Sequence, residues 1–220
     1  MNIIKHLEFF NPMDIRDPIH IIGLGAIGSH LCMQLTRLGC DNFYLYDFDT
    51  VEDKNVANQI YYWKDKKKLK TDATIENMRM INPDIKIHAF DKGYSRQALS
   101  GYVFLAVDSI DLRRDIASAN QYNDNIKVMF DFRMGLADAQ HYACNWSVDR
   151  MKENFLKTMD FTREEAKAAQ PVSACGTSLS VLPTVEVITA LGVSNFINHV
   201  KGVPLRAMIL IDAFSFDIIG

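Results

Sequence analysis

The sequence has few cysteines, and none of them lies in a metal-binding spacing. Its four cysteines (Cys32, Cys40, Cys144 and Cys175) are scattered, and no two of them form a C-x-x-C pair. Structural zinc sites use cysteine or histidine pairs at short spacings, and disulfide frameworks need a higher density of cysteine. We therefore expect neither a zinc site nor a disulfide framework. Each cysteine is instead interpreted as a small buried apolar side chain.

Long apolar runs and an excess of basic residues are also missing. No run approaches the ~18 apolar residues of a membrane-spanning helix. Residues 1–17 do not follow the charged, apolar and small-residue order of a secretory signal. The formal charge of −3 argues against a general nucleic-acid binder, which needs a basic face. We predict a cytoplasmic protein that neither crosses a membrane nor binds nucleic acid.

What the chain does contain is an alternation of strand and helix patterns. With 220 residues, of which 48% are apolar, it can bury a core as one domain spanning 1–220, and no repeat or low-complexity linker divides it. Strands separated by helices pair in parallel, so we predict an α/β fold with a mostly parallel sheet flanked by helices and added C-terminal strands. The weakly apolar segment 151–172 is interpreted as a surface excursion. We expect strands at 18–22, 42–46, 86–90, 102–107, 127–132, 138–146 and 206–211, and helices at 29–38, 71–80, 111–120, 151–169 and 183–200.

A glycine-rich loop joins the first expected strand to the first expected helix. Gly23, Gly25 and Gly28 form a G-x-G-x-x-G pattern, and Asp47 follows the next strand nineteen residues after Gly28. Glycines allow a tight turn and close backbone approach, the helix N-terminus offers free N–H groups to phosphate, and the acid is placed for ribose hydroxyls. The pattern predicts a nucleotide site, unless the glycines only close a turn. An NAD-dependent oxidoreductase is the first interpretation.

The stretch from Tyr46 to Gln59, YDFDTVEDKNVANQ, argues against that interpretation. It carries four acids and three side-chain amides without a glycine or proline. Dinucleotide enzymes need one acid at this strand end and place few demands on the residues after it. The spacing that needs an explanation is Asp47-x-Asp49-x-Val51-x-x-x-Asn55-x-x-x-Gln59, followed by Lys70 and by Asn82-Pro83-Asp84.

This spacing resembles the ThiF/MoeB/HesA family, the bacterial relatives of ubiquitin-activating enzymes, over roughly residues 18–218. The resemblance implies a Rossmann-like fold and a homodimer that binds ATP and Mg²⁺. It also implies transfer of AMP to a carboxylate, with release of pyrophosphate. We expect that carboxylate to end a small protein or peptide, of the ubiquitin-like or sulfur-carrier type with a C-terminal glycine. The likeness continues at Val107-Asp108, in Gly135-x-x-x-x-Gln140, in Cys175 followed by Pro183, and in Ile209-Leu-Ile-Asp212.

By position, the resemblance assigns roles to individual residues. Lys70 would steady the phosphates of the transition state, Asp108 would hold magnesium, and Cys175 would serve in sulfur or acyl transfer. The implied nucleotide contacts are Gly23, Gly25, Ala26 and Gly28 in the loop, Asp47 and Asp49 after the second strand, and Asn55, Asn58, Gln59, Lys70, Asp108 and Ser109 beyond it.

Two family arginines have no direct counterpart. The family carries arginine immediately before the glutamine, where this chain has Asn58, and Arg16 is the sole arginine before the first strand. One hypothesis is that other cations compensate, and its rival is an ATP-binding or scaffold protein with weak or no adenylation. The candidate compensating cations are Lys64 to Lys68, Arg113, Arg114 and Arg133.

Each candidate also has an ordinary structural interpretation. Asp47, Asp49 and Asp108 could cap turns or helices, and Cys175 could be structural at a tight turn. Asn55 and Gln59 could be solvated amides on one helix face. Lys70 lies in the basic run KDKKKLK, where a solvated side chain is the simpler expectation.

Overall fold

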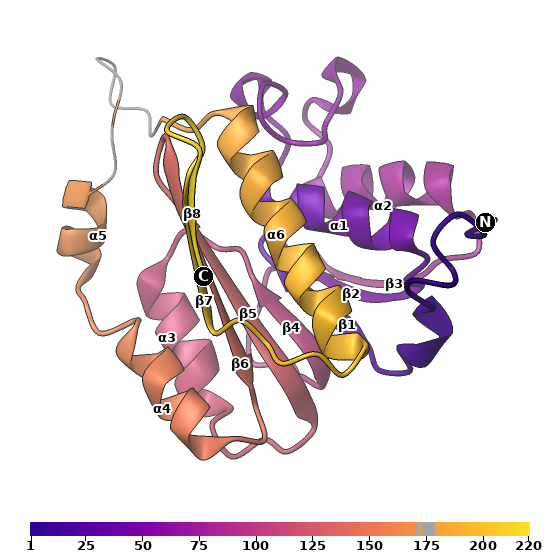
Figure 1. Ribbon diagram of the computed structural model, residues 1–220. Coiled ribbons are helices and arrows are strands. Elements are labelled where there is room, and N and C mark those ends of the chain that lie inside the picture. Colours follow the sequence, from indigo (N-terminus) through magenta and orange to yellow (C-terminus); the bar gives the residue numbers. More distant parts are fainter. Residues whose placement is uncertain (170–171, 173–178) are drawn as a thin grey trace.

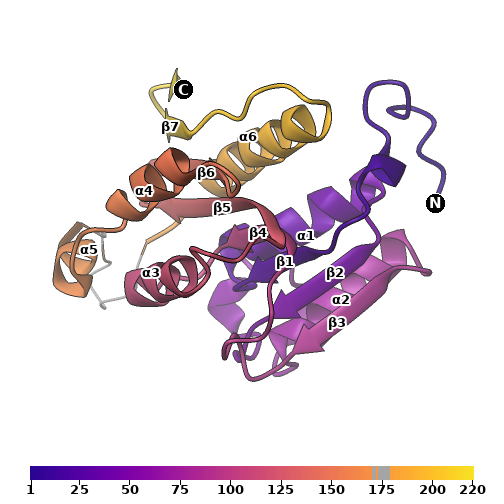
Figure 2. The ribbon, with the colours of Figure 1, turned by 90° about the horizontal axis from the view of Figure 1, so that it is seen from below.

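Eight strands form a single sheet in the order β3-β2-β1-β4-β5-β6-β7-β8 (Figures 1 and 2). The computed structural model describes residues 1–169, 172 and 179–220. The strands are β1 (Ile19–Ile22), β2 (Asn42–Tyr46), β3 (Lys86–Phe90), β4 (Gly101–Leu105), β5 (Ile126–Met134), β6 (Asp138–Asn145), β7 (Met208–Asp212) and β8 (Asp217–Ile219).

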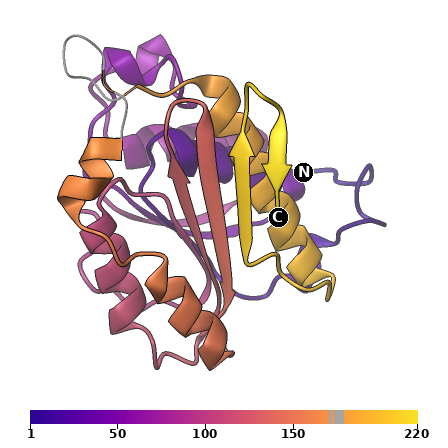
Figure 3. The same cartoon turned by 60° about the vertical axis from the view of Figure 1, so that its left-hand side comes forward.

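The sheet has a parallel half and an antiparallel half. Strands β3, β2, β1, β4 and β5 pair in parallel, whereas β6, β7 and β8 are added antiparallel at one edge. The antiparallel hairpin of β7 and β8 ends the sheet (Figure 3, yellow). Because β1 pairs with both β2 and β4, the chain reverses direction across the sheet at β1. A crevice opens at such a reversal, at the carboxyl ends of the strands.

Helices cover both faces of the sheet. One core cluster joins α1, α6 and the side chains of Ile21, Phe43 and Phe130, and the other joins α3, α4 and the opposite face, including Val103 and Met129. None of the described helices is long and apolar enough to cross a membrane. The helices are α1 (Ala26–Leu38), α2 (Lys70–Ile81), α3 (Ile110–Ala119), α4 (Asp149–Lys157), α5 (Arg163–Ala169) and α6 (Leu182–Val200), with short 3-10 helices at Pro12–Asp14, Asp53–Asn55 and Trp63–Asp65.

The expected elements are present, with differences near the C-terminal part. The α/β fold, the mostly parallel sheet and the added strands are confirmed, and β2 and β3 have the predicted bounds. The expected helix at 151–169 is two helices, and β8 was not expected. Within the expected surface excursion, Phe155 and Met159 are buried. Their i, i+4 spacing gives a mostly polar segment an apolar stripe, which packs α4 onto the sheet.

Candidate functional site

A cavity of about 720 Å³ lies at the carboxyl ends of the parallel strands. The glycine loop and the turn after β4 meet there, which is the position expected for a ligand site in a sheet of this topology. On one side the wall includes Gly23, Gly25, Ala26, Asp47, Phe48, Asp49, Lys70, Lys92 and Tyr94. On the other it includes Asp108, Arg113, Phe132, Arg133, Met134, Asp138, Gln140, Phe161, Leu179 and Ser180.

The three glycines of the loop differ in the space that a Cβ atom would meet. Gly23 has φ +94°, and a Cβ there would lie 2.8 Å from the carbonyl carbon of Ala106. A Cβ on Gly28 would lie 1.8 Å from the Gly23 carbonyl oxygen. These two glycines close the loop against the protein itself. Gly25 is different, because a Cβ added there meets no described atom within 4 Å.

Gly25 therefore borders open space in the cavity. It is the N-cap of α1 and makes no side-chain capping bond, so the first-turn N–H groups of a 13-residue helix are left to another acceptor. A helix N-terminus of this kind favours an anion through both its N–H groups and its dipole. The loop fits a phosphate group.

Asp47 holds the loop and still lines the cavity. Its Oδ2 accepts from the Leu24 N–H at 2.6 Å, and its Oδ1 accepts from the Asp49 N–H at 2.8 Å. Partial burial raises the pKa of Asp47, while the bond from Leu24 and the charge of Lys70 act in the opposite direction. Asp47 therefore caps the turn, as its structural interpretation predicted. Its position at the end of β2 would also let it accept hydrogen bonds from ribose hydroxyls.

Lys70 differs from the lysines before it because it is buried. Its side chain is 8% exposed, and its Nζ lies 2.7 Å from Asp49 Oδ2. Lys70 is the first residue of α2, and its N–H donates to the Asp49 carbonyl at 2.9 Å. Because it is buried at the cavity wall, Lys70 is not the solvated side chain that the basic run KDKKKLK suggested.

Asn55, Asn58 and Gln59, three predicted nucleotide contacts, are not among the described residues that line the cavity. Asn55 is buried, and its Oδ1 accepts from the Glu52 N–H at 2.8 Å, so it closes a short 3-10 helix. Asn58 donates from Nδ2 to Ser180 Oγ, a wall residue just before α6. The Oε1 of Gln59 is buried and has no hydrogen-bond partner among the described residues. Asn55 and Asn58 therefore make structural hydrogen bonds.

Asp108 lies on the turn after β4, with its side chain exposed to the cavity. The cap of α3 is Ser109, whose Oγ accepts from the Leu112 N–H at 3.2 Å, so capping does not occupy Asp108. The described residues contain no group of three or more acidic, histidine or cysteine side chains arranged for a metal. One carboxylate suffices for a magnesium ion that a nucleotide brings, because phosphates and waters supply the other ligands.

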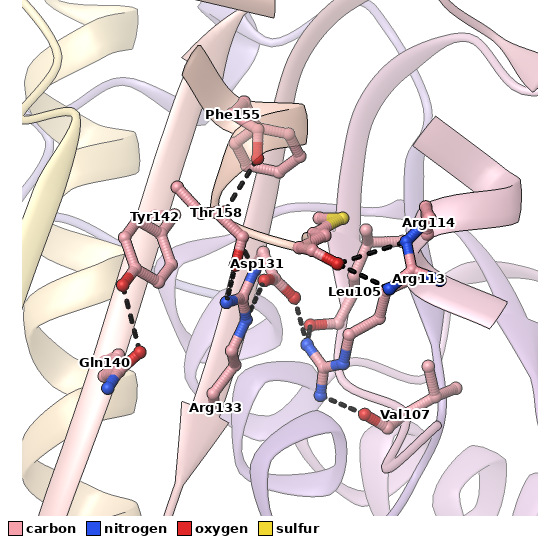
Figure 4. Close-up of polar contacts among 11 residues, drawn as sticks. Leu105, Val107, Arg113, Arg114, Asp131, Arg133, Gln140, Tyr142, Phe155 and Thr158 are labelled. Atoms are coloured by element: carbon pink, nitrogen blue, oxygen red, sulfur yellow. Dashed lines mark hydrogen bonds and ion pairs between the residues drawn. The ribbon is translucent and has the colours of Figure 1, made fainter. Parts of the chain in front are cut away.

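An ion network borders the cavity on the side of β5 (Figure 4). Asp131 is fully buried between Arg113, which donates to its Oδ1, and Arg133, whose Nε lies 2.7 Å from its Oδ2. Arg114 instead donates to the carbonyls of Met159 and Phe161. The three arginines considered as compensating cations are therefore all engaged with protein oxygens, although Arg113 and Arg133 still line the cavity.

Sequence reasoning missed part of the wall. The missed residues are Lys92 and Tyr94 after β3 and Asp138 at the start of β6. Gln140, of the motif Gly135-x-x-x-x-Gln140, also lines the cavity and accepts from the Tyr142 hydroxyl at 3.0 Å. The available signal was topological, since residues that follow neighbouring parallel strands meet at one sheet edge. Cys175, a predicted catalytic residue, lies outside the described residues.

A glycine loop between β1 and α1, an acid at the end of β2 and a cavity at the reversal point place the chain among the Rossmann-like α/β proteins. The model of the ThiF family matches residues 16–218. The chain belongs to the ThiF family.

Curated relatives resemble parts of the chain. Ubiquitin-like modifier-activating enzyme 5 of Drosophila virilis is 33% identical over 146 residues, covering 57% of this chain and 35% of the relative. The Oryza sativa subsp. japonica protein of the same name is 40% identical over 78 residues, covering 34% of this chain and 18% of the relative. The chain thus spans about a third or less of these two relatives.

Solved structures share the fold. E. coli MccB with succinimide has a TM-score of 0.74 at 16% identity, over 94% of this chain and 64% of that one. PaaA has a TM-score of 0.72 at 15% identity, over 99% of this chain and 67% of that one. E. coli MccB with ATP has a TM-score of 0.71 at 16% identity, over 94% of this chain and 64% of that one.

Proposed function

We propose that this protein binds Mg-ATP in the cavity and adenylates a carboxylate, releasing pyrophosphate. One observation carries the proposal. Open space at Gly25, the buried ammonium of Lys70 and the carboxylate of Asp108 border one cavity in a ThiF-family chain. The arrangement offers N–H donors and a cation for phosphates, and a carboxylate for the counter-ion.

The residues of the cavity would divide the work as follows. The N-terminus of α1 would bind phosphate oxygens, and Asp47 would accept from the ribose. Lys70 would leave its ion pair with Asp49, in part or wholly, to stabilise charge on the phosphates as the carboxylate attacks the α-phosphorus. Asp108 would hold magnesium, which supplies charge neutralisation along the triphosphate. Catalysis of this kind depends on positioning and electrostatics.

We propose that the carboxylate ends a protein or peptide. The far side of the cavity, with Phe132, Met134 and Phe161, has an apolar wall that can accommodate a chain end beside the nucleotide. The names of the relatives and structural neighbours support this class of substrate, since one is a ubiquitin-like modifier-activating enzyme and others are MccB structures with MccA. A C-terminal glycine would let the carboxylate approach the nucleotide without a side chain beside it.

Assembly and location belong to the same proposal. A homodimer follows from the family resemblance. A cytoplasmic location is supported by Cys32, Cys40 and Cys144, which are free thiols as expected in a reducing compartment.

The test is ATP–pyrophosphate exchange with peptides that end in glycine, and in other residues, beside calorimetric binding of ATP and NAD. Exchange that depends on both peptide and magnesium supports the adenylyltransferase. Binding of ATP without exchange on any peptide would indicate an ATP-binding scaffold. Asn58 and the arginines that already bond protein oxygens are consistent with that rival interpretation. Tighter binding of NAD than of ATP would instead support the first interpretation, an NAD-dependent oxidoreductase.

A further inference from the structure

Asp131 is a buried carboxylate between two arginines. It lies on β5 with 0% of its surface exposed, and each of its two oxygens accepts from a different guanidinium. Arg113 reaches it from α3 and Arg133 from two residues further along β5. Burying such an ion group is weak evidence for stability, since apolar side chains of similar volume often serve as well. Its arrangement therefore needs another explanation.

Arg113 uses its remaining donors on the turn after β4. Its Nη1 donates to the Leu105 carbonyl at 3.3 Å, and its Nη2 donates to the Val107 carbonyl. Between these two carbonyls, the Ala106 N–H donates to the Ile22 carbonyl at 2.8 Å. Arg113 thus fixes the backbone on both sides of Ala106, immediately before Asp108.

Asp108 lies between two fixed points. The Val107 carbonyl is held by Arg113, and the next residue, Ser109, is held as the cap of α3. Asp108 itself is exposed and lines the cavity. The direction of its carboxylate therefore depends on how firmly Arg113 is held.

Arg133 holds the other end of the network. It donates to the Thr158 carbonyl at 2.5 Å and to Thr158 Oγ1 at 2.9 Å. Its guanidinium also lies over the rings of Tyr142 and Phe161, at 4.7 and 5.5 Å. Because a carboxylate is planar, fixing its Oδ2 through Arg133 also fixes the direction in which Oδ1 meets Arg113 (Figure 4).

We infer that Asp131 is a positioning residue: acting through Arg113, it orients the Val107–Asp108 turn so that Asp108 can hold the nucleotide's magnesium ion. The inference rests on the proposed function for the role of Asp108. Groups that orient a metal ligand without touching the metal commonly change metal affinity by about 10- to 100-fold when they are replaced. Asp131 would act on the ion indirectly, through the Arg113 side chain and the Val107–Asp108 turn.

The test is Asp131→Asn. The amide keeps the shape, but its NH₂ group faces an arginine N–H, so one of the two bonds is lost. We expect magnesium-dependent affinity for α,β-methylene-ATP, measured by calorimetry, to fall about tenfold or more. Affinity for the same analogue in EDTA should change less than about twofold. In the ligand-free protein, hydrogen–deuterium exchange at residues 105–109 should become faster, because the turn opens more often.

Two further variants keep the test decisive. Arg113→Lys retains the charge but cannot reach Asp131 and two carbonyls together, so it should reproduce the result if Asp131→Asn does not fold. Arg114→Lys is the matched control on the same helix, since Arg114 contacts the carbonyls of Met159 and Phe161, and it should leave magnesium dependence unchanged. Equal losses with and without magnesium, or unchanged exchange at 105–109, would overturn the inference. A wild-type protein that binds no nucleotide refutes the proposed function, while the exchange at 105–109 still decides the positioning role.

Discussion

The two sides of the cavity are built in different ways. On the first, which we call the nucleotide side after the proposed ligand, the wall comes from the glycine loop, residues 46–49, Lys70 and residues 92–94, and Gly25 borders space that no described atom fills. On the second, the arginine side, Arg113, Asp131 and Arg133 satisfy one another and the nearby carbonyls. The first side leaves open space at the N-terminus of α1, whereas Arg113, Asp131 and Arg133 on the second hold the shape of the wall around Asp108.

The largest effect should come from a glycine that closes the loop. Gly28→Ala places a methyl group 1.8 Å from the Gly23 carbonyl oxygen, which no side-chain movement can relieve. We expect a loss of about 4 kcal/mol or more in the free energy of unfolding, or failure to fold. Urea denaturation followed by circular dichroism measures it. A variant of near wild-type stability would show that the loop has room to rearrange.

The buried lysine should be the strongest single determinant of activity. Lys70→Met keeps an apolar stem at the wall and leaves Asp49, which is half exposed, without its partner. Loss of a cation at a phosphate site is expected to lower pyrophosphate exchange about 10²- to 10³-fold with the fold intact. Lys54→Met, which removes an exposed ion pair with Glu52, is the matched control. Equal activity of the two variants would remove Lys70 from the mechanism.

Lowering the pH should lower the free energy of unfolding, because a buried histidine near the arginine side must then be protonated. The Asn195 amide donates to Nε2 of buried His141, because its oxygen already accepts from the Arg206 N–H, so His141 is neutral. Burial lowers the pKa of His141 to about 4, which outweighs the opposing charge of Asp131. Because this pKa is lower in the folded protein, His141 contributes fully to the free energy of unfolding above pH ~6.5. The contribution, about 3 kcal/mol, is lost as the pH falls toward 4.

Unfolding in urea at pH values from 7 to 4 measures this loss. His141→Gln should flatten the pH dependence by the share that His141 contributes. The residual slope belongs to other groups, including His20, whose pKa burial also lowers to about 4. An unchanged slope in His141→Gln would contradict the neutral assignment.

The smallest change in stability should come from Gly25→Ala. Its methyl group enters open space, so the free energy of unfolding should stay within about 0.5 kcal/mol of the wild type. Affinity for ATP should nevertheless fall about tenfold, since the methyl group occupies the approach of a phosphate to the α1 N-terminus. Calorimetric titration with ATP measures the change. Unaltered affinity would place the phosphates elsewhere in the cavity.

The nucleotide side was largely predictable from sequence because its signals are local. The glycine loop and Asp47 lie at fixed offsets from strands whose patterns are plain, and the structure brings Gly23, Gly25 and Asp47 to one cavity with Lys70 and Asp108. The roles of Asn55 and Asn58 were harder to predict, because an amide serves a ligand or a turn equally well.

The arginine side could not be predicted in the same way. Arg113, Asp131, Arg133 and Thr158 come from α3, β5 and the link after α4, and apart from the two-residue step between Asp131 and Arg133 no spacing in the chain relates them. A buried aspartate in an apolar strand was the one available clue. The packing of α4 was missed for a related reason, since a stripe of Met151, Phe155 and Met159 is short beside the polar residues around it.

The bond between Asn58 and Ser180 has an evolutionary consequence. It joins residues that are 122 positions apart, from the polar stretch to the start of α6. An arginine at position 58 would be too long for this bond and would leave Ser180 without that donor. Since the family resemblance implies an arginine at position 58, we expect positions 58 and 180 to change together in descent. The order of those substitutions, rather than either one alone, would determine whether intermediate sequences keep a working site.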